Sequence, residues 1–213
     1  MKILLFLILL TGVLSARELT PDETRDLLVR LVEKRDRQSV QAEFREEKHL
    51  ALMKKPVIET GTLAFLPPDK FRRDVPGRSL TVCDGKTLWL YYPEFNEVEK
   101  YALSSSRALR ESLAALTSGF GLLDLEKSYD VTAREVAEGY QLSLRPKTAR
   151  LRQSVQHIAV DLSPAFSVRR LEVLGAGGDR TVTTFSQERT VPLREADFQF
   201  QPPEGASVSE PLG

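Results

Sequence analysis

Side chains that could act as acids, bases or nucleophiles are few in this chain. It holds two histidines and one cysteine in 213 residues. His49 follows a run of charged residues, His157 lies within a predicted strand, and Cys83 precedes a predicted turn. These positions are typical of surface or strand-face side chains and of a packed thiol, not of a general base or nucleophile. The sequence also lacks a Gly-x-Ser-x-Gly elbow, a His-Glu-x-x-His pair and a Walker loop, so it predicts a binding protein and not an enzyme.

Carboxylates, metal ligands and net charge narrow the chemistry further. Glu46 with Glu47, and Glu97 with Glu99, could supply the carboxylate pair of a glycoside hydrolase, but nothing distinguishes them from solvated strand positions. One cysteine and two histidines are too few for a closed zinc site, and one cysteine excludes an intrachain disulfide. Neither a metal nor a cofactor is therefore predicted. Lys and Arg number 30 and Asp and Glu number 30, and this zero balance argues against a nucleic-acid partner.

The first residues predict a secretory signal peptide. Met1–Lys2 is a short basic start, and residues 3–10 are all apolar. Small residues follow at Ser15 and Ala16, and a cut after either one fits the pattern. The apolar run is far shorter than the roughly 20 residues that span a bilayer. No cysteine follows it to receive a lipid, so we expect a signal peptide over 1–16 and an exported, soluble domain over 17–213.

The elements that follow are one helix and then mostly strands. The helix is predicted to begin near Pro21. Its apolar stripe consists of Leu27, Leu28, Leu31 and Val32. Beyond about residue 38 the apolar and polar residues alternate, which is typical of strands, and Asp84-Gly85 predicts a two-residue type I′ hairpin. About ten strands at a spacing of roughly 8 to 12 residues favour an antiparallel sheet or barrel.

One segment interrupts the strands. Residues 104–117 predict an amphipathic helix, with Leu109, Leu113 and Leu116 on one face. Gly119-Phe120-Gly121 then ends it. The helix either plugs one end of a barrel or forms a lid over an apolar cavity. The residues alone leave both interpretations open.

Three segments carry a resemblance to a known family. They are residues 61–73, which read Gly-Thr-Leu-Ala-Phe-Leu-Pro-Pro-Asp-Lys-Phe-Arg-Arg, residues 84–89, which read Asp-Gly-Lys-Thr-Leu-Trp, and residues 198–208, which read Phe-Gln-Phe-Gln-Pro-Pro-Glu-Gly-Ala-Ser-Val. With the signal peptide and the first helix, they make the chain similar to the periplasmic outer-membrane lipoprotein carrier family, LolA, as a divergent branch. The resemblance implies an α+β fold of mainly antiparallel β structure. It would be an incomplete, half-open β-barrel with an N-terminal helix and an inserted lid helix over an apolar cavity.

The resemblance also implies a function. The chain would be a periplasmic carrier that shields the acyl chains of lipoproteins, or of another acylated lipid, during transfer from the inner to the outer membrane. Its partners would be this cargo, an inner-membrane ABC-type release complex and an outer-membrane acceptor, and we expect a monomer.

A set of apolar residues is expected to line the cavity and the lid, although each could equally be an ordinary core position. These residues are Phe44, Leu63, Phe65, Trp89, Tyr91, Leu109, Leu113, Leu116 and Phe120. Trp89 and Tyr91 share one face of their strand, opposite Leu88, and the sequence leaves open which face points inward.

One position departs from the family pattern. The family's lid-latching arginine precedes the proline of a Lys-Arg-Pro stretch, and that place falls here on Pro67. Arg72 and Arg73 are the nearby candidates to replace it. Two other functions remain open: a periplasmic regulator that binds lipoproteins and a membrane stress-response partner, and an enzyme acting on lipid or envelope glycan. The regulator carries a second domain, for which we expect little room after the final motif of this chain.

Overall fold

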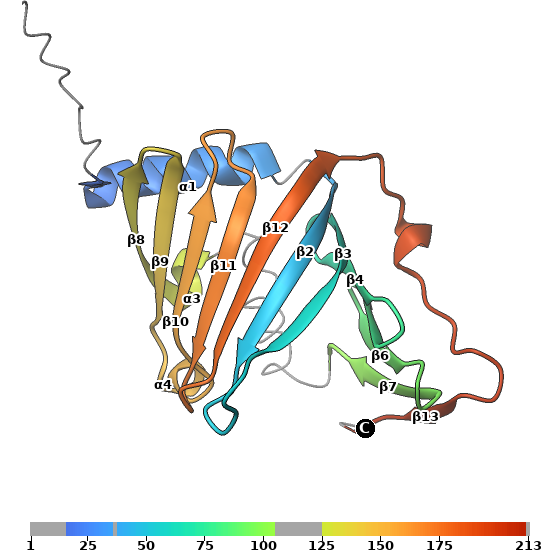
Figure 1. Cartoon of the computed structure of the whole chain (residues 1–213). Coiled ribbons are helices and arrows are strands. Elements are labelled where there is room, and N and C mark those ends of the chain that lie inside the picture. Colours follow the sequence, from blue (N-terminus) through green and yellow to red (C-terminus); the bar gives the residue numbers. More distant parts are fainter. Residues whose placement is uncertain (1–15, 36–37, 105–124, 212–213) are drawn as a thin grey trace, which may run out of the picture.

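The chain forms a large open β-sheet with one long helix across one end and shorter helical segments elsewhere (Figure 1). The computed structural model describes residues 16–35, 38–104 and 125–211. The strands are β1 (Arg17–Glu18), β2 (Val40–His49), β3 (Val57–Leu66), β4 (Lys70–Val75), β5 (Ser79–Asp84), β6 (Thr87–Tyr92), β7 (Glu97–Ala102), β8 (Tyr129–Val136), β9 (Gly139–Pro146), β10 (Val155–Leu162), β11 (Val168–Gly175), β12 (Arg180–Thr190) and β13 (Ser207–Ser209). The helices are α1 (Pro21–Arg35), α3 (Leu125–Ser128), α4 (Ala149–Arg152) and the 3₁₀ turn η1 (Glu195–Phe198).

The sheet consists of two antiparallel meanders that lie side by side. Strands β2 to β7 form one and β8 to β12 form the other, and β12 pairs with β2. The full order is β1-β8-β9-β10-β11-β12-β2-β3-β4-β5-β6-β7-β13, in which β13 pairs parallel to β7. Because β1 and β13 lie at the two ends of this order, the described sheet does not close into a barrel. The prediction of a mainly antiparallel, incomplete barrel is confirmed.

The β5–β6 hairpin confirms the predicted chain reversal but corrects its turn type. The strands end and begin at Asp84 and Thr87, so Gly85 and Lys86 form the connection. Gly85 has a φ of 89°, whereas Lys86 is not among the residues with positive φ, and a type I′ turn needs positive φ at both central positions. The Asp84 carboxylate instead accepts hydrogen bonds from the N–H groups of Lys86 (2.8 Å) and Thr87 (2.7 Å). These side-chain hydrogen bonds stabilise the hairpin. The turn does not adopt the type I′ backbone geometry that Asp-Gly predicts.

Helix α1 lies across one end of the sheet and covers the apolar core there (Figure 1). Thr20 caps it: the Glu23 N–H donates to Thr20 Oγ1 (3.3 Å), and the Thr20 N–H donates to Glu23 Oε2 (2.8 Å). Leu27, Leu28 and Leu31 are buried and join the core cluster of the sheet. The predicted helix and its apolar stripe are therefore confirmed.

The end of the chain forms a strap, which we define as residues 191–211, along the outside of β4 to β7 (Figure 1). Phe198 is fully buried, in η1, which packs against β4 and β5. The Phe200 ring contacts the rings of Trp89 and Tyr91, and β13 then pairs with β7. The Phe-x-Phe motif of the sequence therefore clamps the strap to the sheet.

Two predicted features lie outside the described residues. The first is the signal peptide, apart from Ala16, and the second is the inserted helix with Leu109, Leu113, Leu116 and Phe120. In the part of the chain that the structure does describe, no helix is both long enough and apolar enough to cross a membrane.

Candidate functional site

The two faces of the sheet differ in what covers them. We define the inner face as the one whose side chains join α1 in the core cluster, and the outer face as the opposite one. Side chains alternate along a strand, so every second residue belongs to the same face. On β2, Val40 belongs to the core cluster, which also places Ala42 and Phe44 on the inner face. On β6, Leu88 and Leu90 mark the inner face in the same way.

Three predicted cavity residues lie together on this inner face. Phe65 pairs with Val40 across β2 and β3, and Leu63 lies two residues before it on the same face. Phe44 and Phe65 are buried, whereas Leu63 is half-buried against the core cluster. Phe44 sits opposite Gly61, where an added Cβ would come within 3.0 Å of the Phe44 ring. The same Cβ would lie only 1.9 Å from the Asp74 carbonyl oxygen, so glycine at this position leaves room for the neighbouring backbone as well as for the ring.

The structure separates Trp89 and Tyr91 from these three residues. Both lie on the outer face of β6, because they alternate with Leu88 and Leu90. The centroid of the Phe200 ring lies 5.7 Å from that of Trp89 and 5.9 Å from that of Tyr91. The strap covers these two rings, so they do not line the inner face. The sequence could not decide this orientation, because β6 is apolar on both of its faces.

The meander of β8 to β12 contributes an apolar surface to the inner face. None of its residues was among the cavity residues predicted from the sequence. Its buried members are Ala133, Leu142, Leu144, Ile158, Val160 and Leu171. Val131 and Val173 are half-buried and pack against the same cluster. The alternation of Ile158, Val160 and Leu162 was the available signal, since these apolar residues share one face of the strand. The inner face is thus apolar on both meanders near α1.

A charged cluster replaces this apolar surface farther from α1. We define it as Glu46, Lys48, Glu59 and Arg73, all on the inner face of β2, β3 and β4. Arg73 Nη2 lies 2.9 Å from Glu46 Oε1 and 3.1 Å from Glu59 Oε2. Lys48 Nζ lies 2.9 Å from Glu59 Oε2 and 3.3 Å from Glu46 Oε1. The side chains of Glu46 and Glu59 are only 14% and 12% exposed, so each carboxylate depends on these partners.

Arg73 joins the charged cluster to the apolar surface. Its guanidinium carbon lies 4.5 Å from the centroid of the Phe44 ring, within the range of a cation–π contact. Arg72 follows the opposite alternation and lies on the outer face of β4. Of the two arginines near Pro67, only Arg73 therefore reaches the inner face.

The pKa of the Glu59 carboxyl reflects this environment. Burial alone would raise it, but hydrogen bonds from Lys48 and Arg73, together with their positive charges, bring it below its usual value. Glu46 gains a further hydrogen bond from Thr183 Oγ1 (3.0 Å). Glu59 is therefore favoured as the anion, and Glu46 has hydrogen-bond or ion-pair partners on β2, β4 and β12.

Polar groups also lie on the inner face of β6 and β7, where Tyr101 pairs with Leu88 and Glu99 pairs with Leu90. The Tyr101 hydroxyl donates to Glu99 Oε2 (2.8 Å), and burial followed by this hydrogen bond raises the pKa of Tyr101 to about 12. Burial and the negative charge of Glu99 raise the pKa of Tyr92, while the charge of Lys48 opposes the shift. Lys48 therefore lies within electrostatic range of β6 across the inner face. The inner face thus carries polar and charged side chains on the β2–β7 meander, whereas the β8–β12 meander stays apolar at the level of Lys48, through Val173, Ile158 and Leu144.

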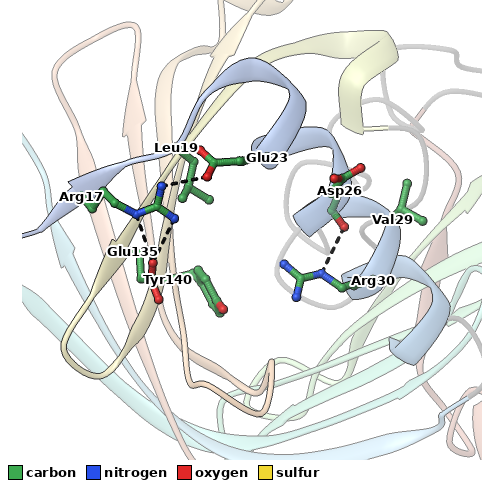
Figure 2. A pocket seen from close by; sticks show the side chains of 8 residues that line it. All are labelled: Arg17, Leu19, Glu23, Asp26, Val29, Arg30, Glu135 and Tyr140. Carbon is green, nitrogen blue, oxygen red and sulfur yellow. Dashed lines mark hydrogen bonds and ion pairs between the residues drawn. The ribbon is translucent and has the colours of Figure 1, made fainter.

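A separate hollow of about 490 Å³ lies between α1 and the β8–β9 edge of the sheet. Figure 2 shows Arg17 between Glu23 and Glu135, with Val29 and Arg30 across the hollow on α1. Arg17 lies 2.8 Å from Glu23 and 3.2 Å from Glu135, and its hydrogen bond lowers the pKa of Glu23 to about 2. These charges satisfy one another at an exposed site, so the hollow does not suit an alkyl chain.

The histidines do not form a catalytic site with the described residues. His157 Nε2 lies 2.8 Å from Ser143 Oγ on the outer face, in a polar groove of about 400 Å³. Within the described ranges, no carboxylate hydrogen-bonds to this histidine as an orienting acid would. His49 lies near Glu47 at the end of β2. The part of the chain that the structure describes also contains no group of three or more metal-ligating side chains.

The fold and inner face define a class of protein: an open β half-barrel with an apolar inner face. The family described as "Outer membrane lipoprotein carrier protein LolA" matches residues 35–201. An outer-membrane lipoprotein carrier protein from Dechloromonas aromatica is 31% identical over 174 residues, covering 80% of each chain. Another with the same name, from Cupriavidus necator, is 33% identical over 153 residues, covering 70% of this chain and 69% of that protein. The chain therefore belongs to the LolA family, whose members are carrier proteins and not enzymes.

A solved structure shares the fold. It is an uncharacterized conserved protein from Thermus thermophilus, which aligns with a TM-score of 0.54 at 16% sequence identity. The alignment covers 88% of this chain and 99% of that protein. The open, curved sheet is therefore an architecture that also occurs in a distantly similar sequence.

Proposed function

We propose that this protein is a periplasmic carrier that shields the acyl chains of a lipoprotein, or of another acylated lipid, during transfer from the inner to the outer membrane. The observation that supports it is an apolar inner face on an open sheet in a LolA-family chain. The name of the two relatives, outer-membrane lipoprotein carrier protein, points to the same class of cargo. An alkyl chain gains about 0.8 kcal/mol for each CH₂ removed from water, so a soluble carrier must offer a comparable apolar surface.

The polarity of the inner face gives the cargo an orientation. The acyl chains lie over the apolar part of the inner face, beside half-buried residues that pack against the core cluster, such as Leu63, Leu90 and Val131. The polar head lies toward the charged cluster, because an alkyl chain placed there would strip water from charged groups without replacing their hydrogen bonds. Leu109, Leu113, Leu116 and Phe120 form the covering lid in this proposal, as the sequence suggests.

Partners follow from the same proposal. An inner-membrane ABC-type release complex delivers the cargo and an outer-membrane acceptor receives it, while the carrier travels between them as a monomer. Release requires that burial be incomplete, since a carrier that matched the whole transfer free energy of the chains would retain them. The half-buried state of Leu63 and Leu90 fits a surface that contacts cargo without a fully closed core around it.

Native mass spectrometry tests the proposal. The mature protein is purified from periplasm without detergent, and a diacylated peptide is then titrated into it. We expect an acylated species to co-purify with the wild type and with the control Thr62→Asp, which alters the outer face of β3. Leu63→Asp, on the inner face of the same strand, should lose it, and Leu113→Asp should lose it if the lid is correctly assigned. Thermal melting establishes that each variant is folded.

Two outcomes would reject the carrier function. The first is a folded Leu63→Asp variant that binds acylated ligands as well as the wild type does. The second is a wild-type protein that neither co-purifies with an acylated species nor binds the added peptide.

A further inference from the structure

The connection between β2 and β3 exposes apolar side chains to solvent. We define it as the β2–β3 tip, residues 50–55. Leu52 is 100% exposed and Met53 is 52% exposed, and the next two residues, Lys54 and Lys55, are exposed as well. Single apolar residues on a surface need no explanation, but two adjacent ones beside two lysines at the end of a hairpin form a distinct patch.

Hydrogen bonds hold this tip in its outward conformation. The Met53 N–H donates to the Leu50 carbonyl (2.9 Å), which closes a turn with Leu52 inside it. The Ala51 N–H donates to Asp179 Oδ1 (2.8 Å), in the neighbouring β11–β12 connection. The tip is therefore tied to the adjacent hairpin, and Leu52 is presented to solvent by a fixed backbone.

The chemistry of the tip matches the surface of an anionic bilayer. Leucine and methionine suit the boundary between headgroups and acyl chains, and lysines suit anionic headgroups. Within the described ranges, Lys54 and Lys55 form no ion pair, whereas the nearby Glu59 is already paired within the charged cluster. Two apolar side chains are far too few for a stable protein interface, which buries about 800 Å² on each partner. They are sufficient for a shallow, reversible contact with lipid.

The position of the tip relates it to the inner face. β2 begins beside α1 at Val40 and ends at His49, so the tip lies at the far end of the strand from the helix (Figure 1). Lys48 and Glu59 lie on the two strands that the tip connects, which places this end of the inner face, with the charged cluster, next to the tip. Contact with a bilayer through the tip would bring this end of the inner face toward the lipid surface.

We propose that the β2–β3 tip is a membrane-docking element, in which Leu52 and Met53 enter the interface of an anionic bilayer and Lys54 and Lys55 bind its headgroups. The proposal goes beyond the carriage of acyl chains. It concerns a surface outside the apolar part of the inner face, and it holds for the protein without cargo.

Cosedimentation with lipid vesicles tests the docking element. The probes are vesicles of phosphatidylcholine with phosphatidylglycerol at about 3:1, and vesicles of phosphatidylcholine alone, each mixed with the delipidated mature protein. We expect Leu52→Asp/Met53→Asp to reduce partitioning onto the mixed vesicles by about tenfold or more, because two inserting side chains become charged. The control is Val29→Asp, which alters a 51%-exposed apolar residue on α1 at the other end of the sheet and should bind as the wild type does.

The lysines are tested in the same assay. Lys54→Gln/Lys55→Gln should weaken binding to the mixed vesicles by about fivefold per lysine, and should have little effect with phosphatidylcholine alone. Arg25→Gln/Arg30→Gln on α1 removes the same charge elsewhere and should not weaken it. All tip variants should still bind the diacylated peptide, which separates this test from that of the carrier function.

Three results would overturn the proposal. The wild type could fail to bind the mixed vesicles, or the tip variants could bind them as tightly as the wild type, or the α1 controls could lose binding to the same extent. Capture of a membrane protein through the tip, without vesicle binding, would assign the tip to a protein partner and would also refute docking to lipid.

Discussion

Replacing Arg73 with methionine tests the energetics of the charged cluster. Methionine keeps much of the side-chain volume and removes the cation that lies 2.9 Å from Glu46 and 3.1 Å from Glu59. Removing one partner of a fully buried ion pair costs about 3–5 kcal/mol. Here Lys48 remains beside both carboxylates, which also keep some solvent contact. We therefore expect a loss of about 2 kcal/mol at pH 7, or roughly 4–8 °C in melting temperature for a domain of this size.

The pH dependence makes this prediction specific. The folded-state pKa of Glu59 lies below its ordinary value, so the cluster contributes stability that is complete above the unfolded-state pKa of about 4.3. That contribution is lost as the pH falls through the lowered folded-state pKa. Arg73→Met brings the folded-state pKa of Glu59 back toward its ordinary value. The difference in unfolding free energy between wild type and variant should therefore be largest near pH 7. It should narrow steadily as the pH falls below about 5.

Urea unfolding followed by fluorescence measures both effects, since the chain has one tryptophan, Trp89. The matched control is Arg72→Met, on the outer face of the same strand, where the described residues provide no ion pair. We expect the control to change stability by no more than about 0.5 kcal/mol at any pH. The reasoning would be falsified if the two variants lost the same free energy of unfolding, or if the loss for Arg73→Met did not become smaller at acidic pH.

Further predictions concern the strap, α1 and the single thiol. Phe200→Ala removes the ring that contacts Trp89 and Tyr91, so Trp89 fluorescence should shift to the red and the free energy of unfolding should fall by about 1–2 kcal/mol. Binding of the acylated peptide should persist. Loss of that binding would contradict the assignment of these rings to the outer face. Leu31→Ala empties a fully buried position beneath α1 and should cost about 2–5 kcal/mol in urea unfolding, whereas a change under about 1 kcal/mol would show that α1 does not pack as described. Burial raises the pKa of the Cys83 thiol. An aromatic disulfide reagent should therefore label the native protein at about pH 8 far more slowly than the urea-unfolded protein. Equal labelling rates would disprove the burial of Cys83.

Local signals in the sequence predicted most of the fold. The cap at Thr20, the apolar stripe of α1 and the alternating strands all depend on residues that are near one another in the chain, so spacing alone reveals them. The turn type of the β5–β6 hairpin was predicted wrongly. The Asp84 carboxylate accepts hydrogen bonds that stabilise a turn different from the one that Asp-Gly usually adopts.

Features that depend on distant residues could not be predicted in the same way. Trp89 faces outward because Phe200, far along the chain, returns to cover it, and no pattern within β6 records that contact. The choice of Arg73 over Arg72 for the inner face follows from the registers of β2, β3 and β4, which bring Glu46 and Glu59 to it. Identifying a site residue in this sheet therefore required the pairing of strands as well as their alternation.

An open sheet has two edges, and each edge strand here is met by a short strand from a different end of the described chain. β1 pairs with two residues of β8, and β13 pairs with three residues of β7. Unpaired edges are the places at which one β-protein adds to another and begins a fibre. The short strands protect the edges, because they occupy part of each edge and have too few backbone N–H and C=O groups of their own to extend the sheet. The half-barrel can then remain open and still resist edge-to-edge aggregation.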